Sequence, residues 1–306
     1  MYRGRFAPSP TGPLHFGSLV AAVASYLAAR RVNGEWLLRI EDVDRIREVP
    51  GSADDIVRTL TTFGFQWTGP IARQSERTGL YETYLRELIH TGLGYPCSCS
   101  RKAVAAAAIA HPGDGDEPRY PGSCRQGPLD PDVDCAIRLK VEPGPVEFLD
   151  EIQGHTLSDV SRECGDFVLK RRDGLFAYQL AVVVDDAEQG ITHVVRGADL
   201  LTVTPRQIVL QRALGFKTPA YAHVPLATDR HGVKLSKSAG AGAVDARKPA
   251  EELWRSLEFL RQSPPAELRF AELDTVWNWA FEHWTAAPLQ GLRQTAVVAS
   301  STGRSG

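Results

Sequence analysis

The sequence has neither a long hydrophobic run nor an apolar leader. No apolar stretch in its 306 residues reaches the ~18 residues that a membrane-spanning helix needs. The N-terminus carries Arg3 and Arg5 and then several prolines, without the apolar centre of a signal peptide. These absences predict a cytoplasmic protein that has no membrane partner.

The chain also lacks a strong excess of charge of either sign, since its formal net charge is −2. Nucleic-acid binding usually shows as a basic domain, but a local basic surface is sufficient for it. Lys170-Arg171-Arg172 and Arg30-Arg31 are candidate contacts for RNA. Short clusters of this kind belong more often to solvated surface. Composition therefore neither indicates nor excludes an RNA partner.

Cysteine is scarce, and the five cysteines are odd in number, which argues against a disulfide framework in a cytoplasmic chain. Their spacing is more informative. Cys97 and Cys99 are one residue apart and can share a metal ion, while Tyr120 and Cys124 can complete a tetrahedron. Tyrosine is an unusual zinc ligand, so His111 is a rival fourth ligand. Reduced cysteines in a small core are the alternative to a metal site.

Alternating strand and helix patterns predict an α/β fold with βαβ units and a parallel sheet. Helical spacing of apolar residues is found at 17–31, 52–63, 79–92, 205–214 and 245–290. Strand patterns are found at 36–40, 135–141, 146–149, 167–169, 179–184, 193–195 and 222–226. Cys135 and Cys164 fall on apolar, strand-like segments and are expected to be buried. No internal repeat is visible.

Changes in composition divide the chain into four parts. Residues 1–94 and 166–240 carry the strand–helix alternation and form one discontinuous catalytic domain in this interpretation. Residues 95–165, where Pro, Gly, Asp and Cys accumulate, read as an insertion with its own small core. Residues 241–298 form a helical C-terminal region. The tail 299–306, made of Ser, Thr and Gly with one Ala and one Arg, is expected to be disordered.

Two short segments indicate a site for a nucleoside triphosphate. A loop stiffened by prolines and glycines leads His15 and Gly17 to the start of an apolar helix. Backbone N–H groups at a helix N-terminus bind phosphate, and Gly17 has no side chain to block an adenine ring. Downstream, Lys234-Leu235-Ser236-Lys237-Ser238 offers cations for charge that develops on a phosphate. Each segment alone also fits a surface helix end or a basic loop, but together they predict ATP-dependent activation of a carboxylate.

With these two segments the chain resembles the class I aminoacyl-tRNA synthetases, and within that class the glutamyl branch. His15-Phe16-Gly17-Ser18 matches the family's His-Ile-Gly-His element, and Lys234–Ser238 matches its Lys-Met-Ser-Lys-Ser element. Further matching segments, spread over residues 3–240, are Arg5–Gly12, Leu38–Asp44, Leu180–Asp186 and Gly190–Gly197. Ser18 replaces the last His of the first element, which removes one potential phosphate contact.

The resemblance implies a Rossmann-type catalytic domain that binds ATP with Mg²⁺. The ATP-binding positions carried over by motif are Thr11, His15, Gly17, Ser18 and Lys237, and the catalytic positions are His15, Gly17, Lys234 and Lys237. Little proton chemistry is needed for such an activation, so positioning and charge stabilisation supply the rate. The sequence shows no obvious nucleophilic triad.

A pocket specific for glutamate needs cations for two carboxylates, hydroxyls, and one carboxylate for the ammonium group. Arg5 and Arg196 supply bidentate forks, and Glu41 can pair with the α-ammonium. The resemblance assigns glutamate binding to these three residues together with Ala7, Ser9 and Tyr178. Which arginine meets the side-chain carboxylate stays open.

Only 68 residues follow Ser238, too few for a further independent domain of about 100 residues. Full-length glutamyl-tRNA synthetases continue there with an anticodon-binding domain, whereas the truncated glutamyl-Q tRNA(Asp) synthetase family does not. Similarity to that family implies activation of L-glutamate without tRNA and its transfer to queuosine in the anticodon loop of tRNA(Asp). It also implies one structural Zn²⁺ at the two Cys, Tyr and Cys positions. A monomer is expected.

Two other functions remain open. A truncated enzyme could charge the 3′ end of tRNA(Glu) with the same chemistry. A non-enzymatic paralogue could keep the fold to bind a nucleotide or RNA, although His15, Gly17 and Lys237 are intact.

Overall fold

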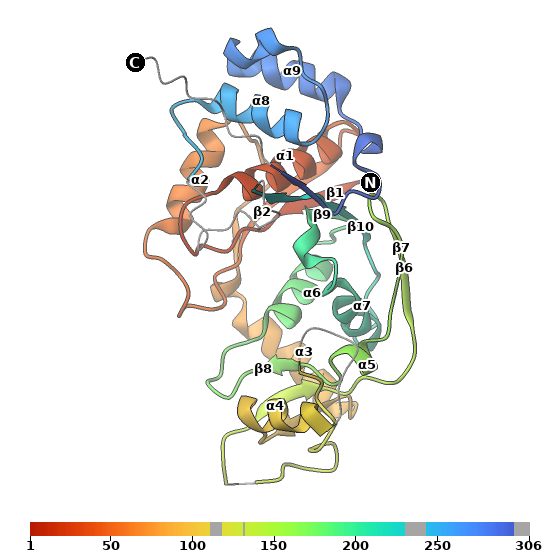
Figure 1. The fold of residues 1–306 in the computed structure, drawn as a ribbon. Coiled ribbons are helices and arrows are strands. Elements are labelled where there is room, and N and C mark those ends of the chain that lie inside the picture. Colours follow the sequence, from red (N-terminus) through yellow and green to blue (C-terminus); the bar gives the residue numbers. More distant parts are fainter. Residues whose placement is uncertain (111–117, 131, 230–242, 297–306) are drawn as a thin grey trace, which may run out of the picture.

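A computed structural model describes residues 1–110, 118–130, 132–229 and 243–296. Parallel strands form its central layer (Figure 1). One sheet has the order β1-β2-β3, from β1 (Arg3–Phe6), β2 (Glu35–Ile40) and β3 (Ala72–Arg73). The other has the order β7-β6-β10-β9, from β6 (Val146–Asp150), β7 (Gly154–Ser158), β9 (His193–Gly197) and β10 (Ala220–Val224). The backbone N–H of Thr192 donates to the carbonyl of Arg3 at 2.9 Å, so β1 lies beside β9 and the two sheets adjoin.

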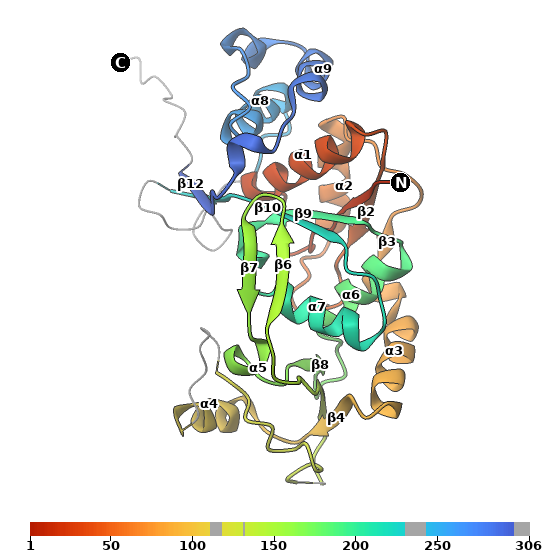
Figure 2. The same ribbon diagram turned by 90° about the vertical axis from the view of Figure 1, so that its right-hand side faces the viewer.

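Helices cover both faces of this layer (Figures 1 and 2). On one side lie α1 (Phe16–Arg30), α2 (Ser52–Thr62), α8 (Pro249–Phe259) and α9 (Leu273–His283), whose apolar side chains share one core. On the other side lie α3 (Thr78–His90), α6 (Tyr178–Glu188) and α7 (Thr204–Ala213), around a second core. The α/β architecture expected from the strand–helix alternation is confirmed.

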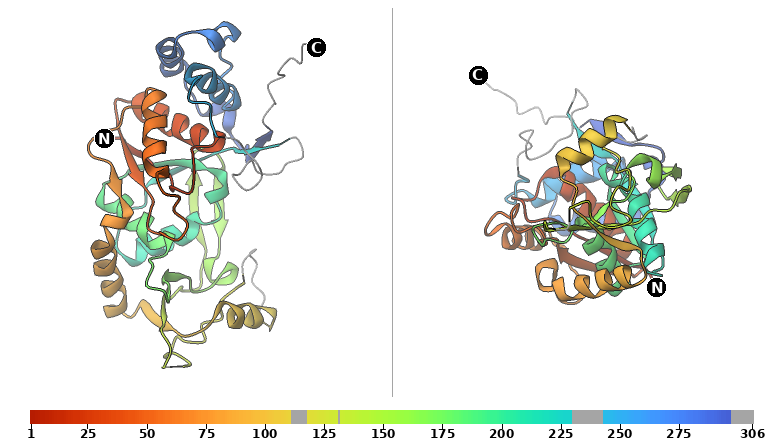
Figure 3. Two further views of the ribbon diagram at one scale, coloured as in Figure 1. Left: turned by 90° about the vertical axis from the view of Figure 1, so that its left-hand side faces the viewer. Right: turned by 90° about the horizontal axis from the view of Figure 1, so that it is seen from below.

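A smaller antiparallel sheet lies at the end of the molecule opposite α8 and α9 (Figures 2 and 3). Its order is β4-β5-β8, from β4 (Gly94–Cys97), β5 (Ala136–Leu139) and β8 (Val168–Lys170). With α4 (Arg101–Ala110) it encloses a small core of Tyr95, Cys97, Val104, Tyr120 and Cys124. The short helix α5 (Val160–Glu163) precedes β8.

The hairpin β6–β7 departs from the sequence interpretation. It falls within residues 95–165, yet Asp150 at the end of β6 pairs in parallel with Tyr221 of β10 in the central layer. The two strand-like segments at 135–141 and 146–149 also do not pair with each other, because β5 is already paired on both edges with β4 and β8. Pairing partners depend on long-range geometry, which the strand pattern alone does not contain.

The strand expected at 179–184 is wrong, since these residues belong to helix α6. The run Leu180–Val184 is buried on every side, between the sheet and its neighbouring helices. A continuous apolar run fits a buried strand and a buried helix equally well. Asp185 and Asp186, which follow this run in the same helix, are buried as well.

Shorter elements complete the described chain. Turns of 3₁₀ helix lie at η1 (Gln74–Glu76), η2 (Ala198–Leu200), η4 (Ala266–Phe270) and η5 (Ala287–Leu289), and β11 (Leu226–Thr228) pairs with β12 (Gln294–Ala296). The tail 299–306 lies outside the described residues. Within the described part of the chain, every helix is too short or too polar to cross a membrane.

Candidate active site

The carboxyl ends of β1, β2, β9 and β10 open into one cavity of about 760 Å³, which we name the His15 cavity. Ligands of open α/β sheets bind at this edge, where loops after the strands diverge. The cavity brings together ten sequence-predicted positions: Arg5, Ala7, Ser9, Thr11, His15, Gly17, Ser18, Glu41, Tyr178 and Arg196. Lys234 and Lys237 lie outside the described residues.

The loop after β1 is held in shape before it enters α1. The Ser52 hydroxyl donates to the carbonyl of Gly12 at 2.6 Å, and it accepts from the Gly12 N–H at 3.0 Å. Gly12 has a φ of 129°, which a residue with a side chain rarely adopts. Ser52 on α2 therefore fixes the turn that carries the chain past the cavity.

His15 is the N-cap of α1 and lines the cavity. Its Nδ1 accepts from the Ser18 backbone N–H at 3.3 Å, and its Nε2 lies 3.0 Å from the Ser18 hydroxyl. Among the described residues, the atoms nearest to a Cβ added at Gly17 would be those of the His15 ring, at 3.4 Å, and of Ala227, at 3.9 Å. These are ordinary packing distances, so the described part of the chain leaves room there for a side chain. Glycine at this position would allow a flat ligand group to approach the backbone closely.

Both ends of the segment with the predicted lysines lie near His15. Ala227 lines the His15 cavity, just before that segment begins. After it, Ala243 forms an isolated antiparallel bridge with His15, and the Val244 N–H donates to the carbonyl of Leu14 at 3.0 Å. The described chain therefore returns to the cavity on both sides of the Lys-Ser segment.

Arg5 is held by a buried acid that the sequence interpretation did not single out. Its Nε and Nη2 donate to the two carboxylate oxygens of Asp186, at 3.1 and 3.3 Å. Arg39, which is fully buried, donates to Asp186 at 2.8 Å and to Glu41 at 3.3 Å. Burial opposes ionisation of Asp186, but Arg5 and Arg39 hold its pKa below the usual range. The two hydrogen bonds to Asp186 hold the Arg5 side chain in place, and the Asp186 carboxylate partly neutralises its charge.

Glu41 and Tyr178 share the same cavity wall. Burial raises the pKa of Glu41, although Arg39 and Arg5 oppose that shift. A carboxylate in this position gains strongly from a cationic ligand, because such a ligand replaces the lost hydration. Burial also raises the pKa of Tyr178 to about 12, so its hydroxyl stays protonated and can donate to an anion.

Arg196 on β9 differs from Arg5 in its partners. Its Nη2 donates to the hydroxyl of Thr204 at 2.8 Å and to the amide oxygen of Gln207 at 2.7 Å, and both acceptors are neutral. Its Nη1 is buried and has no hydrogen-bond partner among the described residues. In the part of the chain that the structure describes, no carboxylate forms an ion pair with Arg196. Among those residues the guanidinium of Arg196 therefore has no carboxylate partner, and its Nη1 can take an anion as its acceptor.

The sulfur atoms of Cys97, Cys99 and Cys124 all lie within 4.8 Å of one another. The Tyr120 hydroxyl is 3.3 Å from the Cys97 sulfur and 3.8 Å from the Cys99 sulfur. Tetrahedral zinc with Zn–S bonds of about 2.3 Å needs ligand separations of about 3.8 Å, so these four side chains fit the ion. Nε of Arg138 also donates a hydrogen bond to the Cys97 sulfur at 3.2 Å.

The other candidates for this site are separate from it. His111, the rival ligand, lies outside the described residues. Cys164 is buried as expected, but it caps the end of α5 and is not in a strand. Cys135 precedes β5 and is only half-buried, so its expected burial is wrong. The segment between 132 and 135 is largely exposed, because it loops away from the small core.

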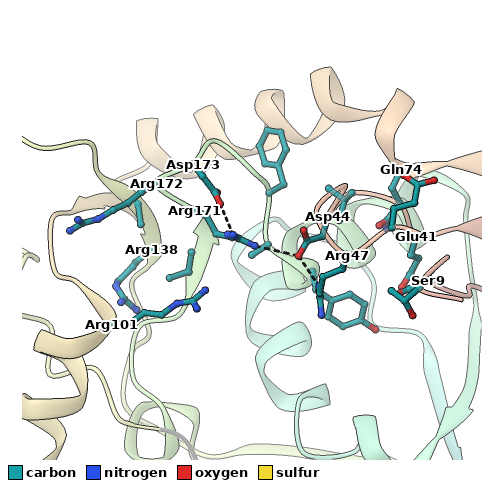
Figure 4. Close-up of a pocket in the computed structure, with 18 of the residues that line it drawn as sticks. Ser9, Glu41, Asp44, Arg47, Gln74, Arg101, Arg138, Arg171, Arg172 and Asp173 are labelled. Carbon is teal, nitrogen blue, oxygen red and sulfur yellow. Dashed lines mark hydrogen bonds and ion pairs between the residues drawn. The ribbon is translucent and has the colours of Figure 1, made fainter. Parts of the chain in front are cut away.

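A second cavity of about 830 Å³ adjoins the first and extends toward the small sheet. We name it the Arg138 cavity (Figure 4). The two cavities share five lining residues: Ser9, Thr11, Glu41, Arg47 and Tyr178. Arg101, Arg138 and Arg172 gather at the end remote from Ser9 and Glu41. Among the described residues none of these three arginines has an ion-pair partner, so that end of the cavity favours anions.

Arg171 in the same cavity is already neutralised, since it pairs with Asp44 at 3.3 Å and with Asp173 at 2.5 Å. Sequence analysis gave the basic cluster at 170–172 as a candidate RNA contact, and the structure brings two of its members to a cavity wall. Arg30 instead donates to the carbonyl of Gln66, and Arg31 to that of Trp284, so this pair supports the fold. Arg101 and Arg138 gave no signal in the sequence.

The protein has the catalytic domain of a class I aminoacyl-tRNA synthetase. Its two adjoining cavities lie at the carboxyl edge of the sheet, beside the start of α1. Residues 1–258 match the family model of tRNA synthetases class I (E and Q), catalytic domain. The fold is also that of a glutamate-tRNA synthetase from Elizabethkingia anophelis, with a TM-score of 0.79 and 25% identity over 97% of this chain and 68% of that one.

Relatives with higher sequence identity identify the family within this class. A glutamyl-Q tRNA(Asp) synthetase from Dechloromonas aromatica is 55% identical over 95% of this chain and 97% of its own. One from Geobacter sulfurreducens is 57% identical over 90% of each. The chain belongs to the glutamyl-Q tRNA(Asp) synthetase family.

Proposed function

We propose that this protein activates L-glutamate with ATP and transfers it to the queuosine base in the anticodon loop of tRNA(Asp). The single observation that carries the proposal is the pair of adjoining cavities. One has a carboxylate-binding arginine beside a helix start suited to ATP. The other ends in three arginines that form no ion pair among the described residues and suit a nucleic-acid backbone. The names of the relatives agree with this arrangement.

In the first step the α-carboxylate of glutamate attacks the α-phosphorus of ATP. A carbon–oxygen–phosphorus anhydride forms, and pyrophosphate leaves with the Mg²⁺ that accompanies ATP as part of the substrate. His15 and the backbone beside Gly17 bind the nucleotide, with Thr11 and Ser18 at the same wall. Lys234 and Lys237 supply positive charge in this proposal. The rate comes from positioning and charge stabilisation, because no protein nucleophile is needed.

Glutamate lies in the His15 cavity with its ammonium group at Glu41, whose raised pKa favours a cationic neighbour. Arg5 and Arg196 receive the two carboxylates, with Ser9, Tyr178 and the backbone of Ala7 as further contacts. In the second step a hydroxyl of the queuosine cyclopentenediol attacks the acyl carbon. AMP leaves as the ester forms, and the hydroxyl proton is lost to solvent.

The proposal divides the chain much as the composition does. Residues 1–94 and 166–240 form the catalytic domain, which hairpin β6–β7 joins through its pairing with β10. The rest of residues 95–165 contacts the acceptor from beside the Arg138 cavity. Zn²⁺ held by Cys97, Cys99, Tyr120 and Cys124 would cross-link β4 to the loop at 120–124. We further propose a monomer in the cytoplasm, since residues of one chain line both cavities.

The test is transfer of radiolabelled glutamate by the purified protein with ATP and Mg²⁺. Queuosine-containing tRNA(Asp), queuosine-free tRNA(Asp) and tRNA(Glu) are compared. We expect label only on the first. Label on tRNA(Glu) irrespective of queuosine would identify a minimal enzyme that charges the 3′ end. Absence of glutamate-dependent pyrophosphate exchange would identify a non-enzymatic paralogue.

A further inference from the structure

Behind Arg196 lies a buried histidine–carboxylate pair that the reaction scheme above does not use. His223 of β10 stands directly opposite Arg196 of β9 in the parallel ladder. Nε of Arg196 lies 3.0 Å from Nε2 of His223. On the other side of the ring, Nδ1 of His223 lies 2.5 Å from a carboxylate oxygen of Asp150, at the end of β6. All three side chains are buried.

The chemistry of the two partners decides which tautomer His223 adopts. A guanidinium can only donate hydrogen bonds, and an ionised carboxylate can only accept them. Nδ1 of His223 must therefore carry the proton that faces Asp150, which leaves the Nε2 lone pair to accept from Arg196. A proton on Nε2 would set an N–H against the N–H of the guanidinium.

Asp150 is itself fixed by the backbone. Its Oδ1 accepts from the N–H groups of Ile152, Gln153 and His223, at 3.0, 2.8 and 3.1 Å. Its Oδ2 is thus the oxygen left for the imidazole. The turn after β6 orients the carboxylate, the carboxylate orients the ring, and the ring receives Nε of Arg196.

With Nε held by His223 and Nη2 held by Thr204 and Gln207, the guanidinium plane of Arg196 cannot rotate without losing three hydrogen bonds. Nη1 is the nitrogen that remains, buried and without a hydrogen-bond partner in the part of the chain that the structure describes. Since Arg196 lines the His15 cavity, a carboxylate bound there can supply the missing acceptor.

We propose that His223 and Asp150 are positioning residues, which hold Arg196 in the orientation that binds a carboxylate of the amino-acid substrate. The identity of that substrate as glutamate rests on the proposed function. The simpler interpretation is that the pair only ties β6 to β10. The two interpretations differ in what happens to glutamate binding when the hydrogen-bond polarity at His223 is reversed and the packing is kept.

Three substitutions make that comparison. His223→Gln places an amide oxygen near the Nε2 position and keeps the acceptor for Arg196. His223→Asn places its amide near Nδ1 and removes that acceptor. Asp150→Asn keeps an oxygen for the three backbone N–H groups but turns an N–H toward the ring, which forces the proton onto Nε2, against Arg196.

The readout is the KM for glutamate, the KM for ATP and kcat in glutamate-dependent pyrophosphate exchange without tRNA. We expect His223→Asn and Asp150→Asn to raise the glutamate KM about 10- to 100-fold, the range for a lost hydrogen bond to a charged group. The ATP KM should change less than about three-fold, and His223→Gln should stay within about five-fold of wild type in its glutamate KM. The matched control is Tyr221→Phe, on the same strand as His223. It removes the buried hydroxyl that accepts a hydrogen bond from Gln211 of α7, and it should leave the glutamate KM unchanged.

Equal effects of His223→Gln and His223→Asn, or parallel rises in both KM values, would overturn the positioning role. If His223→Asn does not fold, a double-mutant cycle replaces it. Asp150→Asn should have little effect on the glutamate KM in a protein that already carries His223→Gln. Additive effects there would contradict the proposal.

Calorimetric titration of the wild-type protein with glutamate separates this inference from the proposed function. Glutamate binding without pyrophosphate exchange would overturn the proposed reaction, and the variants would then be compared by their Kd for glutamate. A wild-type protein that binds no glutamate would overturn both.

Discussion

Arg5 and Asp186 form a two-point buried ion pair, with Nε to Oδ1 at 3.1 Å and Nη2 to Oδ2 at 3.3 Å. The residues are 181 positions apart in the chain, so the pair joins the first strand of the sheet to helix α6. Asp186 also accepts from Arg39. Asp186 is therefore shared by two buried cations at the floor of the active site, and Arg39 has Glu41 as a further acidic partner.

Asp186→Asn should destabilise the fold, because it leaves Arg5 and Arg39 without their shared counter-charge. Breaking a buried ion pair from one side costs about 3–5 kcal/mol, and urea denaturation measures the loss. Asp173→Asn removes an exposed partner of Arg171 and should change the free energy of unfolding by at most about 1 kcal/mol. Equal losses in the two variants would contradict the buried role of Asp186.

Arg196→Lys should lower kcat/KM for glutamate activation by about 100-fold, because a single ammonium cannot replace the fork that meets Thr204, Gln207 and a ligand together. Pyrophosphate exchange at varied glutamate gives the value. Arg30→Lys is the matched control, since Arg30 donates to a backbone carbonyl away from both cavities. A wild-type value in Arg196→Lys would remove Arg196 from the site.

The protein should contain about one zinc ion per chain, bound by three thiolates and one phenolate. Cys99→Ser and Cys124→Ser should lower the zinc content measured by plasma mass spectrometry, while Cys135→Ser should not. Tyr120→Phe separates the fourth ligand from the others, because it keeps the ring and removes only the hydroxyl. Full retention of zinc at high chelator concentration in Tyr120→Phe would assign the fourth position elsewhere.

Arg101→Glu and Arg172→Glu should reduce transfer of glutamate to RNA at least ten-fold while exchange with pyrophosphate continues. The physical reason is repulsion between the new carboxylate and the phosphates of the acceptor, so the defect should shrink as salt is raised. Arg86→Glu, on the exposed face of α3, is the charge-matched control. Equal transfer defects in all three variants would show a general charge effect and no specific role for the Arg138 cavity.

Stability should fall as the pH is lowered from about 6.5 to 4. Burial lowers the pKa of His223 to about 4 in the folded protein, whereas an unfolded histidine titrates near 6.5. Between those values the unfolded state binds more protons, so the free energy of unfolding rises with pH, by about 3 kcal/mol in total from this residue. Urea denaturation at several pH values measures the slope, and His223→Gln should reduce it by up to about 1.4 kcal/mol per pH unit. An unchanged slope would mean that His223 is protonated in the folded state.

By itself the sequence identified the groups on which the proposed chemistry depends. The segment around His15 and Gly17, the lysine-rich segment after it, and the spacing of Cys97, Cys99, Tyr120 and Cys124 are local patterns. Local patterns can be read because short-range geometry and side-chain chemistry define them. Helix α1 and strand β2 were predicted within a residue of their bounds for the same reason.

Only the tertiary structure decided how these groups are supported. The apolar run at 180–184 could form a strand or a helix until its neighbours enclosed it on all sides. Asp150, 73 residues before His223, reaches it only because β6 leaves the insertion to pair with β10. Arg101, Arg138 and Arg172 of the Arg138 cavity come from separate elements and meet across the small sheet. Such partners are set by strand pairing and burial over long stretches of chain, and no local periodicity encodes them.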